Sequence, residues 1–161
     1  MRIVDTRKTT PLWRALEKAA VRHGGGHNHR FALYDGAMVK DNHIVAAGGL
    51  PQAVRAVRDN CHHLVKIEVE VDRVDQIEPA IAAGADVLLL DNMDDDTLEQ
   101  AIACARRLNP AVLLEASGNV SPERIRGMAQ RGLDIDVVSS GGLIHQARWI
   151  DLGLDMLDAG Q

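Results

Sequence analysis

Residues 65–91, VKIEVEVDRVDQIEPAIAAGADVLLLD, decide the fold class of this 161-residue chain. The runs 65–71 and 86–91 are short and aliphatic, as buried strands are, and residues 74–83 between them have helical spacing and end at Gly84. A strand, a helix and a second strand over so short a stretch predict a parallel βαβ unit.

Strands and helices alternate on both sides of this unit. Aliphatic runs predict further strands at 37–40, 112–117 and 135–140, and a last one at 150–154. Helices are predicted at 50–59, at 94–108, from Pro122 (capped by Ser121) to near Gly132, at 142–148, and from Thr10-Pro11 to about His23, before Gly24-Gly25-Gly26. This order predicts one α/β domain over residues 1–161, with a barrel-like parallel sheet of about six strands. The pattern does not separate a closed barrel from an open sheet.

The composition is that of a globular protein with an aliphatic core, because 46% of the residues are hydrophobic and only 2% are aromatic. Cys61 and Cys104 are far apart and lack metal-ligand spacing, which favours a reducing, cytoplasmic location. No apolar run reaches the length of a membrane span, and the first residues do not resemble a signal peptide.

Charge is distributed unevenly along the chain. The total is −5, but residues 1–43 carry +4 and four of the seven histidines, and the remainder carries −9. A basic head on an acidic body favours a small anionic ligand, whereas nucleic-acid binding would call for more aromatic residues and a wider basic face. We therefore expect no nucleic-acid partner.

Polar side chains stand at the carboxyl ends of five predicted strands. In parallel α/β folds these ends meet at one edge, where ligands bind, so a shared site is predicted. The residues are Lys40-Asp41-Asn42-His43, Glu68 and Glu70, Asp91-Asn92, Glu115 with Ser117-Gly118, and Ser139-Ser140-Gly141-Gly142.

Two of these strand ends are glycine-containing turns beside helix starts, where free backbone N–H groups can hold a phosphate. Near the start, Asp5-Thr6-Arg7-Lys8-Thr9 sets two cations beside hydroxyl groups, and such cations suit carboxylate or phosphate ligands. Ordinary loop glycines and a solvated charge cluster are the alternative interpretations.

The histidines at 23, 27 and 29 do not form a convincing zinc site, because they have neither a cysteine partner nor a helical i, i+4 pair. Asp94-Asp95-Asp96 fits a helix N-terminus better than a metal site.

Six strings, in this order, resemble quinolinate phosphoribosyltransferase over nearly the whole chain. They are Asp5-Thr6-Arg7-Lys8-Thr9-Thr10-Pro11, Gly24-Gly25-Gly26-His27-Asn28-His29-Arg30, Lys40-Asp41-Asn42-His43, Glu68-Val69-Glu70-Val71, Leu90-Asp91-Asn92-Met93 and Glu115-Ala116-Ser117-Gly118. The resemblance implies the α/β-barrel domain of an enzyme that couples quinolinate to phosphoribosyl pyrophosphate with Mg²⁺. The products are nicotinate mononucleotide, carbon dioxide and pyrophosphate, a step of NAD biosynthesis.

The resemblance also implies roles for individual residues. Arg7, His29, Arg30 and Lys40 are expected to face the quinolinate carboxylates, with Thr6 beside them and Lys8 between the two substrates. Lys8, Lys40, Glu70 and Asp91 are the expected catalytic residues. Glu70 and Asp91 would serve the ribose hydroxyls and the Mg²⁺–pyrophosphate end, and Ser117, Gly118, Asn119, Ser140, Gly141 and Gly142 would hold the 5′-phosphate.

Several features depart from the family pattern. The domain that precedes the Asp5–Thr9 string in the family, and that covers the site of a neighbouring subunit, is expected to be absent here. Homodimers or higher homo-oligomers and an exposed apolar face are expected as well. Asn119 replaces a glycine. Leu12 also replaces a glycine, at a position within a predicted helix that is expected to tolerate it. The strand before Gly141 is expected to be about two residues longer than in the family, with Ser140 in place of an aliphatic residue.

Three other interpretations are compatible with the sequence. One is a non-catalytic remnant or binding module of the same family. Another is a barrel enzyme acting on a sugar phosphate, such as an aldolase, in which Lys40 would be the reactive lysine. The third is the related molybdenum-associated pyrophosphorylase-like group, which the Arg, His and Lys set fits less well.

Overall fold

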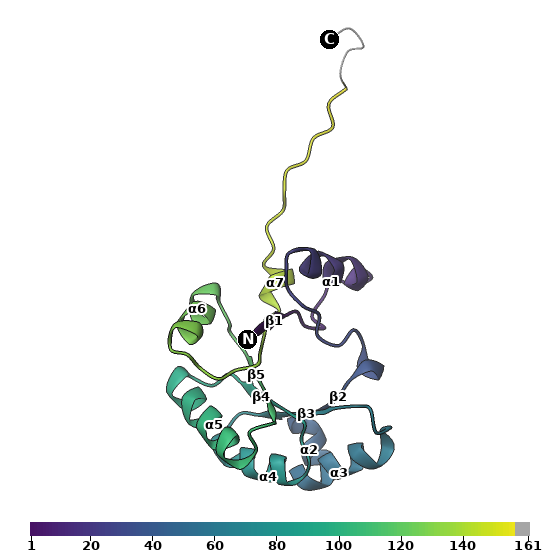
Figure 1. The fold of residues 1–161 in the computed structure, drawn as a ribbon. Coiled ribbons are helices and arrows are strands. Elements are labelled where there is room, and N and C mark those ends of the chain that lie inside the picture. Colours follow the sequence, from purple (N-terminus) through teal and green to yellow (C-terminus); the bar gives the residue numbers. More distant parts are fainter. Residues whose placement is uncertain (157–161) are drawn as a thin grey trace.

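The computed structural model describes residues 1–156, which form one parallel sheet with helices outside it (Figure 1). The sheet order is β1-β6-β5-β4-β3-β2, and each neighbouring pair is parallel. The strands are β1 (Arg2–Val4), β2 (Ala37–Val39), β3 (Ile67–Val71), β4 (Val87–Asp91), β5 (Leu113–Ser117) and β6 (Val137–Ser139). The six predicted parallel strands are thus confirmed in number and direction, although not all in identity.

The helices follow the strands in turn and cover the outer face of the sheet, which curves around a centre in Figure 1. They are α1 (Arg14–His23), α2 (Asp41–Ala47), α3 (Leu50–Asn60), α4 (Ile77–Ala82), α5 (Asp95–Leu108), α6 (Pro122–Gln130) and α7 (Gly142–His145), with 3₁₀ turns η1 (Leu33–Asp35) and η2 (Val74–Gln76). No helix of residues 1–156 is long and apolar enough to cross a membrane.

The core between sheet and helices is aliphatic, as the composition predicts. Val69 and Leu88, which are paired between β3 and β4, are fully buried, as is Leu98 of α5 at 1% exposure. The caps also agree with the sequence: Asp94 Oδ1 accepts from the Thr97 N–H over 2.8 Å, and Ser121 Oγ accepts from the Arg124 N–H over 3.2 Å.

Strand β1 forms one edge of the sheet, and a second chain segment lies against it. Val4 and His27 form an isolated parallel bridge, in which the His27 N–H donates to the Ile3 carbonyl over 2.9 Å and the Asp5 N–H donates to the His27 carbonyl over 3.1 Å. A single residue, His27, is thereby paired with the outer edge of β1.

The helix predicted from Thr10-Pro11 instead begins at Arg14. Residues 11–13 form a turn in which the Trp13 N–H donates to the Thr10 carbonyl over 3.0 Å. Leu12 stands in this turn with a φ of 69° and a fully exposed side chain, so the expectation that it lies within a helix was wrong.

Three other boundaries differ from the prediction. Strand β6 covers 137–139 rather than 135–140, because a tight turn, in which the Ile135 N–H donates to the Leu133 carbonyl, occupies the preceding residues. Helix α7 ends at His145 rather than at 148. Residues 150–154 form no strand, since they find no pairing partner within residues 1–156, and their apolar side chains are exposed.

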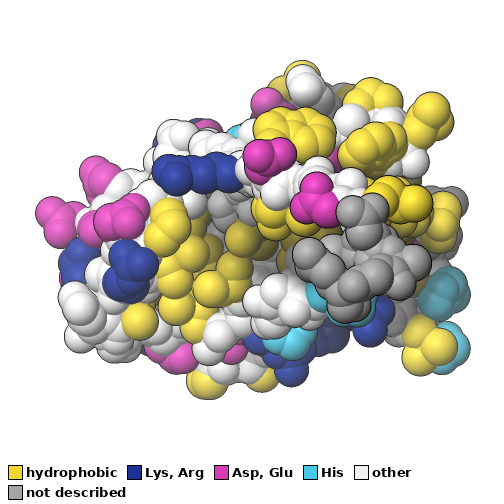
Figure 2. All heavy atoms as spheres, turned by 90° about the horizontal axis from the view of Figure 1, so that it is seen from above, with side chains coloured by type: hydrophobic (Ala, Val, Ile, Leu, Met, Phe, Trp, Pro, Cys, Tyr) yellow, Lys and Arg dark blue, Asp and Glu magenta, His cyan; other side chains and the backbone are white. Residues whose placement is uncertain are grey.

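Exposed apolar side chains gather where α1, α7 and the segment after α7 lie, as expected for an apolar face. Figure 2 shows hydrophobic side chains on this upper side of the molecule. The exposed residues include Leu12, Trp13, Leu16, Leu143, Trp149 and Ile150.

Candidate active site

A pocket of about 630 Å³ opens at the carboxyl ends of the strands. The residues to which the family resemblance assigns roles all line it, although they come from separate strand ends and from the segment before α1. They are Thr6, Arg7, Lys8, His29, Arg30, Lys40, Glu70, Asp91, Ser117, Gly118, Asn119, Ser140, Gly141 and Gly142. The parallel sheet therefore brings the basic head and the acidic and glycine-containing strand ends together at one rim. The strand-end pattern also placed Asp41, Asn42, His43 and Glu68 at the site, but these do not line the pocket, because the first three lie in helix α2 and Glu68 lines a different cavity.

Two arginines that line this pocket lack anionic partners in the part of the chain that the structure describes. Within that part, Arg7 Nε is buried and has no hydrogen-bond partner. The Arg30 guanidinium donates to the Gly36 carbonyl over 2.6 Å and contacts Met38 Sδ at 3.5 Å. Burial lowers the pKa of Arg30, and the nearby charge of Arg7 lowers it further. Among residues 1–156 neither arginine has an ion-pair partner, so an anionic ligand would relieve both the repulsion and the unpaired donor.

Arg14 of α1 holds the backbone around Arg7 in place. Its Nη2 donates to the Arg7 carbonyl over 3.2 Å, its Nε to Thr9 Oγ1 over 3.0 Å, and its Nη1 to the Phe31 carbonyl over 3.2 Å. The segment that carries Arg7 and Lys8 is therefore tied to the segment that follows Arg30.

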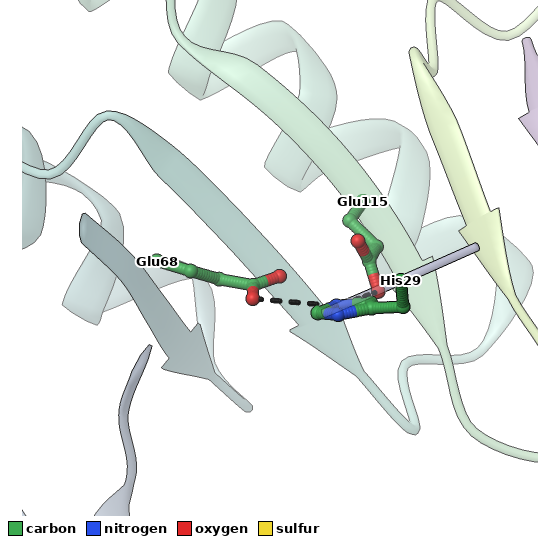
Figure 3. A group of neighbouring side chains, drawn as sticks. All are labelled: His29, Glu68 and Glu115. Atoms are coloured by element: carbon green, nitrogen blue, oxygen red, sulfur yellow. Dashed lines mark ion pairs between the residues drawn. The ribbon is translucent and has the colours of Figure 1, made fainter. Parts of the chain in front are cut away.

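His29 lies between two buried glutamates, Glu68 of β3 and Glu115 of β5, the strands on either side of β4 (Figure 3). Its Nε2 is 3.5 Å from Glu68 Oε2 and 3.5 Å from Glu115 Oε1, and the two glutamates are only 7% and 4% exposed. Its Nδ1 accepts from the Arg30 N–H over 2.7 Å. We expected His29 to face the substrate carboxylates, but both ring nitrogens are directed at protein atoms, and the ring lines the pocket with its remaining surface.

The same ring also lines a second cavity of about 600 Å³ at the amino-terminal ends of the strands. Arg2 and Arg22 line this cavity as well. His29 and Glu115 line both cavities and so lie between them, and Glu68 lines the second one. These three side chains form one cluster. They are the one group of three potential metal ligands within residues 1–156. Because Nδ1 already accepts a hydrogen bond, the ring proton lies on Nε2, which leaves that atom a donor to the carboxylates rather than a metal ligand.

The two acidic residues predicted to serve Mg²⁺ also line the pocket, Glu70 from β3 and Asp91 from the end of β4. Glu70 Oε2 is ion-paired with Lys40 Nζ, and Asp91 Oδ2 accepts from Asn92 Nδ2 over 2.7 Å. One oxygen of each carboxylate is left for a further partner. The Lys40–Glu70 pair joins a predicted substrate-binding cation to a predicted catalytic carboxylate.

The turns after β5 and β6 form the remaining wall of the pocket. Gly118 has a φ of +86°, and a Cβ there would lie 2.1 Å from Asn92 Oδ1, so the turns after β4 and β5 are in close contact. Asn119 adopts the left-handed conformation, with a φ of 47°, as expected of an asparagine in place of glycine. A Cβ on Gly141 would lie 3.5 Å from Thr6 Oγ1, which places the β6 turn beside the basic segment.

Both hydrogen-bond donors of Ser140 are already used within the protein. Its N–H donates to the Val4 carbonyl over 3.0 Å and its Oγ to the Val120 carbonyl over 3.3 Å. Both donors hold neighbouring loops, so this residue shapes the turn rather than offering a hydrogen bond to the pocket.

Further pocket residues were not selected from the sequence as site residues. Asn92 stands in a recognised string but was not given a role, although its φ of 52° and its contact with Gly118 mark it as part of the site. Met38, His145 and Gln146 also line the pocket, and no sequence signal distinguished them.

Comparison with known proteins agrees with this arrangement. A family model described as "Quinolinate phosphoribosyl transferase, C-terminal domain" matches residues 1–155. Proteins named probable nicotinate-nucleotide pyrophosphorylase [carboxylating] from Synechocystis sp. and Bacillus subtilis are 44% and 45% identical over 97% of this chain. The crystal structure of NadC from Streptococcus pyogenes superposes with a TM-score of 0.86 at 45% identity, over 98% of this chain and 55% of that one.

The chain spans about half the length of the curated relatives it matches, 52% of each of the two named above. Its fold agrees with that of the NadC crystal structure over 98% of this chain. The chain belongs to the quinolinate phosphoribosyl transferase family, of which it matches the C-terminal domain.

Proposed function

We propose that the rim pocket transfers a phosphoribosyl group from phosphoribosyl pyrophosphate to quinolinate and releases pyrophosphate and carbon dioxide, giving nicotinate mononucleotide. The observation that supports this most directly is that Arg7 and Arg30 are adjacent and have no ion-pair partner in the described part of the chain, in a pocket that also holds Glu70 and Asp91. A planar dicarboxylate supplies two anionic groups to such a pair of guanidinium groups.

The reaction begins when the ring nitrogen of quinolinate attacks the anomeric carbon of the ribose. The bond from that carbon to the pyrophosphate oxygen breaks, and pyrophosphate leaves with the electron pair. Positive charge that develops on the ribose is stabilised by carboxylates held in place before the reaction, for which Glu70 and Asp91 are suitably located. Lys8 and Lys40 offset the charge of the departing and incoming anions.

Decarboxylation then needs little more than positioning. The ribosylated ring nitrogen is cationic, so it stabilises the electron pair that remains on the adjacent carbon when the bond to carbon dioxide breaks. That carbon takes up a proton from water. The role of Arg7 and Arg30 at this stage is to hold the second carboxylate and so keep the ring in place.

Mg²⁺ fits this pocket as a partner of the pyrophosphate group. Glu70 and Asp91 each keep one carboxylate oxygen without a hydrogen-bond partner in residues 1–156, and Mg²⁺ prefers carboxylate and phosphate oxygens together. When bound, the ion neutralises charge on the leaving pyrophosphate. The turns at Ser117–Asn119 and Gly141–Gly142 would accommodate the 5′-phosphate.

The test is formation of nicotinate mononucleotide from quinolinate, phosphoribosyl pyrophosphate and Mg²⁺, followed by chromatography. The chain should be assayed alone and with the remaining half of a relative supplied in trans, because the relatives are about twice as long. Product in either assay supports the proposal. No product in both assays, with no binding of either substrate by calorimetry, would favour a non-catalytic remnant.

An aldolase-type reaction at Lys40 has less support. Reactive lysines owe their free amine to burial, whereas the Lys40 side chain is 44% exposed and ion-paired with Glu70. Trapping with borohydride and a carbonyl substrate should leave Lys40 unmodified.

We further infer that the protein acts as a cytoplasmic homo-oligomer. The two cysteines are free thiols, which fits a reducing compartment, and the exposed apolar side chains around α1 and α7 provide surface for association. Analytical ultracentrifugation tests the oligomeric state.

A further inference from the structure

Asp5 and Lys18 form an ion pair that is hidden from solvent beside the rim pocket. Asp5 is fully buried and Lys18 is 3% exposed. Asp5 follows the end of β1 and directly precedes Thr6, Arg7 and Lys8, whereas Lys18 lies in the middle of α1. Burying two charges costs free energy unless their remaining hydrogen-bonding capacity is used, so the other partners of this pair are informative.

Those other partners belong to the segment that carries His29. Asp5 Oδ1 accepts from the His29 N–H over 2.9 Å, and Lys18 Nζ donates to the His29 carbonyl over 3.0 Å. Asp5 Oδ2 accepts from Asn28 Nδ2 over 2.6 Å. Both backbone groups of His29 are thus held by the ion pair.

This arrangement links the two segments that supply the pocket's arginines. Arg7 stands two residues after Asp5, and Arg30 directly follows His29, so the separation of the two guanidinium groups depends on how these backbones are joined. An apolar pair of the same size would leave no buried charge behind, but it would hold neither the N–H nor the carbonyl of His29.

We propose that Asp5 and Lys18 are positioning residues, which fix Arg30 and His29 relative to Arg7 and so set the geometry of the dicarboxylate subsite. The inference rests on the proposed function and deepens it. It predicts that loss of the pair weakens quinolinate binding selectively and leaves the phosphoribosyl pyrophosphate end of the pocket intact.

The double variant Asp5→Leu/Lys18→Met tests this in the full chain, because neither new side chain can accept from the His29 N–H or donate to its carbonyl. It removes both charges together, so no unpaired buried charge remains to unfold the protein, as would happen in either single variant. We expect quinolinate to bind about ten- to a hundredfold more weakly by calorimetry, the loss of roughly one charge-assisted contact. Affinity for phosphoribosyl pyrophosphate with Mg²⁺ should be unchanged.

Arg106→Met is the matched control, since it removes another partly buried ion-pair network. Arg106 joins Asp134 and Asp136 with distances of 2.6 and 2.8 Å, but at the opposite, amino-terminal edge of β5 and β6. It should lower the denaturation temperature without changing quinolinate affinity. Unchanged quinolinate binding in the double variant, or an equal loss for both substrates, would overturn the inference.

A measurement without ligand separates this inference from the proposed function. Hydrogen exchange, followed by mass spectrometry, should show faster exchange in the peptide that contains residues 27–30 in the double variant and not in Arg106→Met. If the unmodified chain binds neither substrate, the proposed function fails, but selective loss of protection at 27–30 still supports the positioning role. Uniform loss of protection contradicts it.

Discussion

The backbone N–H of Arg30 donates to Nδ1 of His29 over 2.7 Å, which leaves the imidazole proton on Nε2, between Glu68 and Glu115. Burial by itself lowers the pKa of His29, but the two carboxylates outweigh it and raise that pKa to about 10. Burial, and secondarily the charge of Glu115, raises the pKa of Glu68. The three side chains therefore retain an additional proton at neutral pH, and it lies on the Nε2–carboxylate side because Nδ1 is occupied.

This cluster predicts that stability falls as the pH rises above 6.5. His29 has a higher pKa folded than unfolded, so its contribution is fully present below pH 6.5 and is lost as the pH approaches about 10. Thermal denaturation over this range should show the decline in the wild-type chain and a flatter profile in Glu115→Gln, which removes one of the two charges. Identical profiles for both proteins would contradict the shared proton.

Arg7→Met should separate binding from stability. Removing the unpaired Nε donor and the repulsion of Arg30 costs the fold nothing, so the denaturation temperature should hold or rise. Quinolinate affinity should fall by about 1.5–3 kcal/mol, the value of one charge-assisted contact. Calorimetry and differential scanning measure the two effects on the same sample.

The control for Arg7→Met is Arg126→Met on α6. Arg126 is exposed, pairs only with Glu123 at 3.3 Å, and does not line the pocket. It should change neither quinolinate affinity nor stability by a measurable amount, as is usual for exposed pairs. Equal binding losses in both variants would mean that net charge, rather than the Arg7 contact, governs affinity.

The sequence was sufficient to predict the strands with long aliphatic runs and the set of residues around the pocket. Strands β3, β4 and β5 show alternating polar and apolar residues or apolar runs that are too short for helices. The polar residues at their carboxyl ends must lie close together, because those ends of parallel strands meet at one edge of the sheet. The convergence of Lys40, Glu70 and Asp91 on one pocket follows from that rule, whereas the place of Arg7 was implied by the family resemblance.

The remaining features depend on tertiary contacts that no local pattern encodes. Strand β1 has only three residues and is a strand because it pairs with β6, and α2 follows Lys40 directly, where no helix was predicted. The orientation of His29 is set by Asp5, Glu68 and Glu115, which are far apart in the sequence. The local sequence predicts that Leu12 lies within a helix, but the turn at residues 11–13 requires a left-handed backbone at this position.

Gly118→Ala should destabilise the turn after β5 and weaken phosphoribosyl pyrophosphate binding. The new Cβ would meet Asn92 Oδ1 at 2.1 Å and the Asn92 backbone nitrogen at 2.8 Å, and backbone cannot move aside as a flexible side chain can. We expect a loss of about 2–4 kcal/mol, from the left-handed φ together with the overlap. Gly132→Ala is the matched control, because its φ is also positive but nothing lies within 4 Å, and it should lose only about 1–2 kcal/mol. Similar losses in urea denaturation for both variants would mean that the close approach to Asn92 carries no free energy.

Leu12→Gly should stabilise the protein. Leu12 holds a φ of 69°, which costs an L-residue about 1–2 kcal/mol, and its exposed side chain offers no burial in return. Glycine removes that strain but adds about 0.4–1 kcal/mol of chain entropy to the unfolded state, so the net gain should be about 0.5–1 kcal/mol. Leu16→Gly provides the contrast, because Leu16 is also exposed but lies within α1, where glycine costs about 1 kcal/mol. Urea denaturation should therefore shift the two variants in opposite directions, and a loss of stability in both would show that Leu12 is not strained in solution.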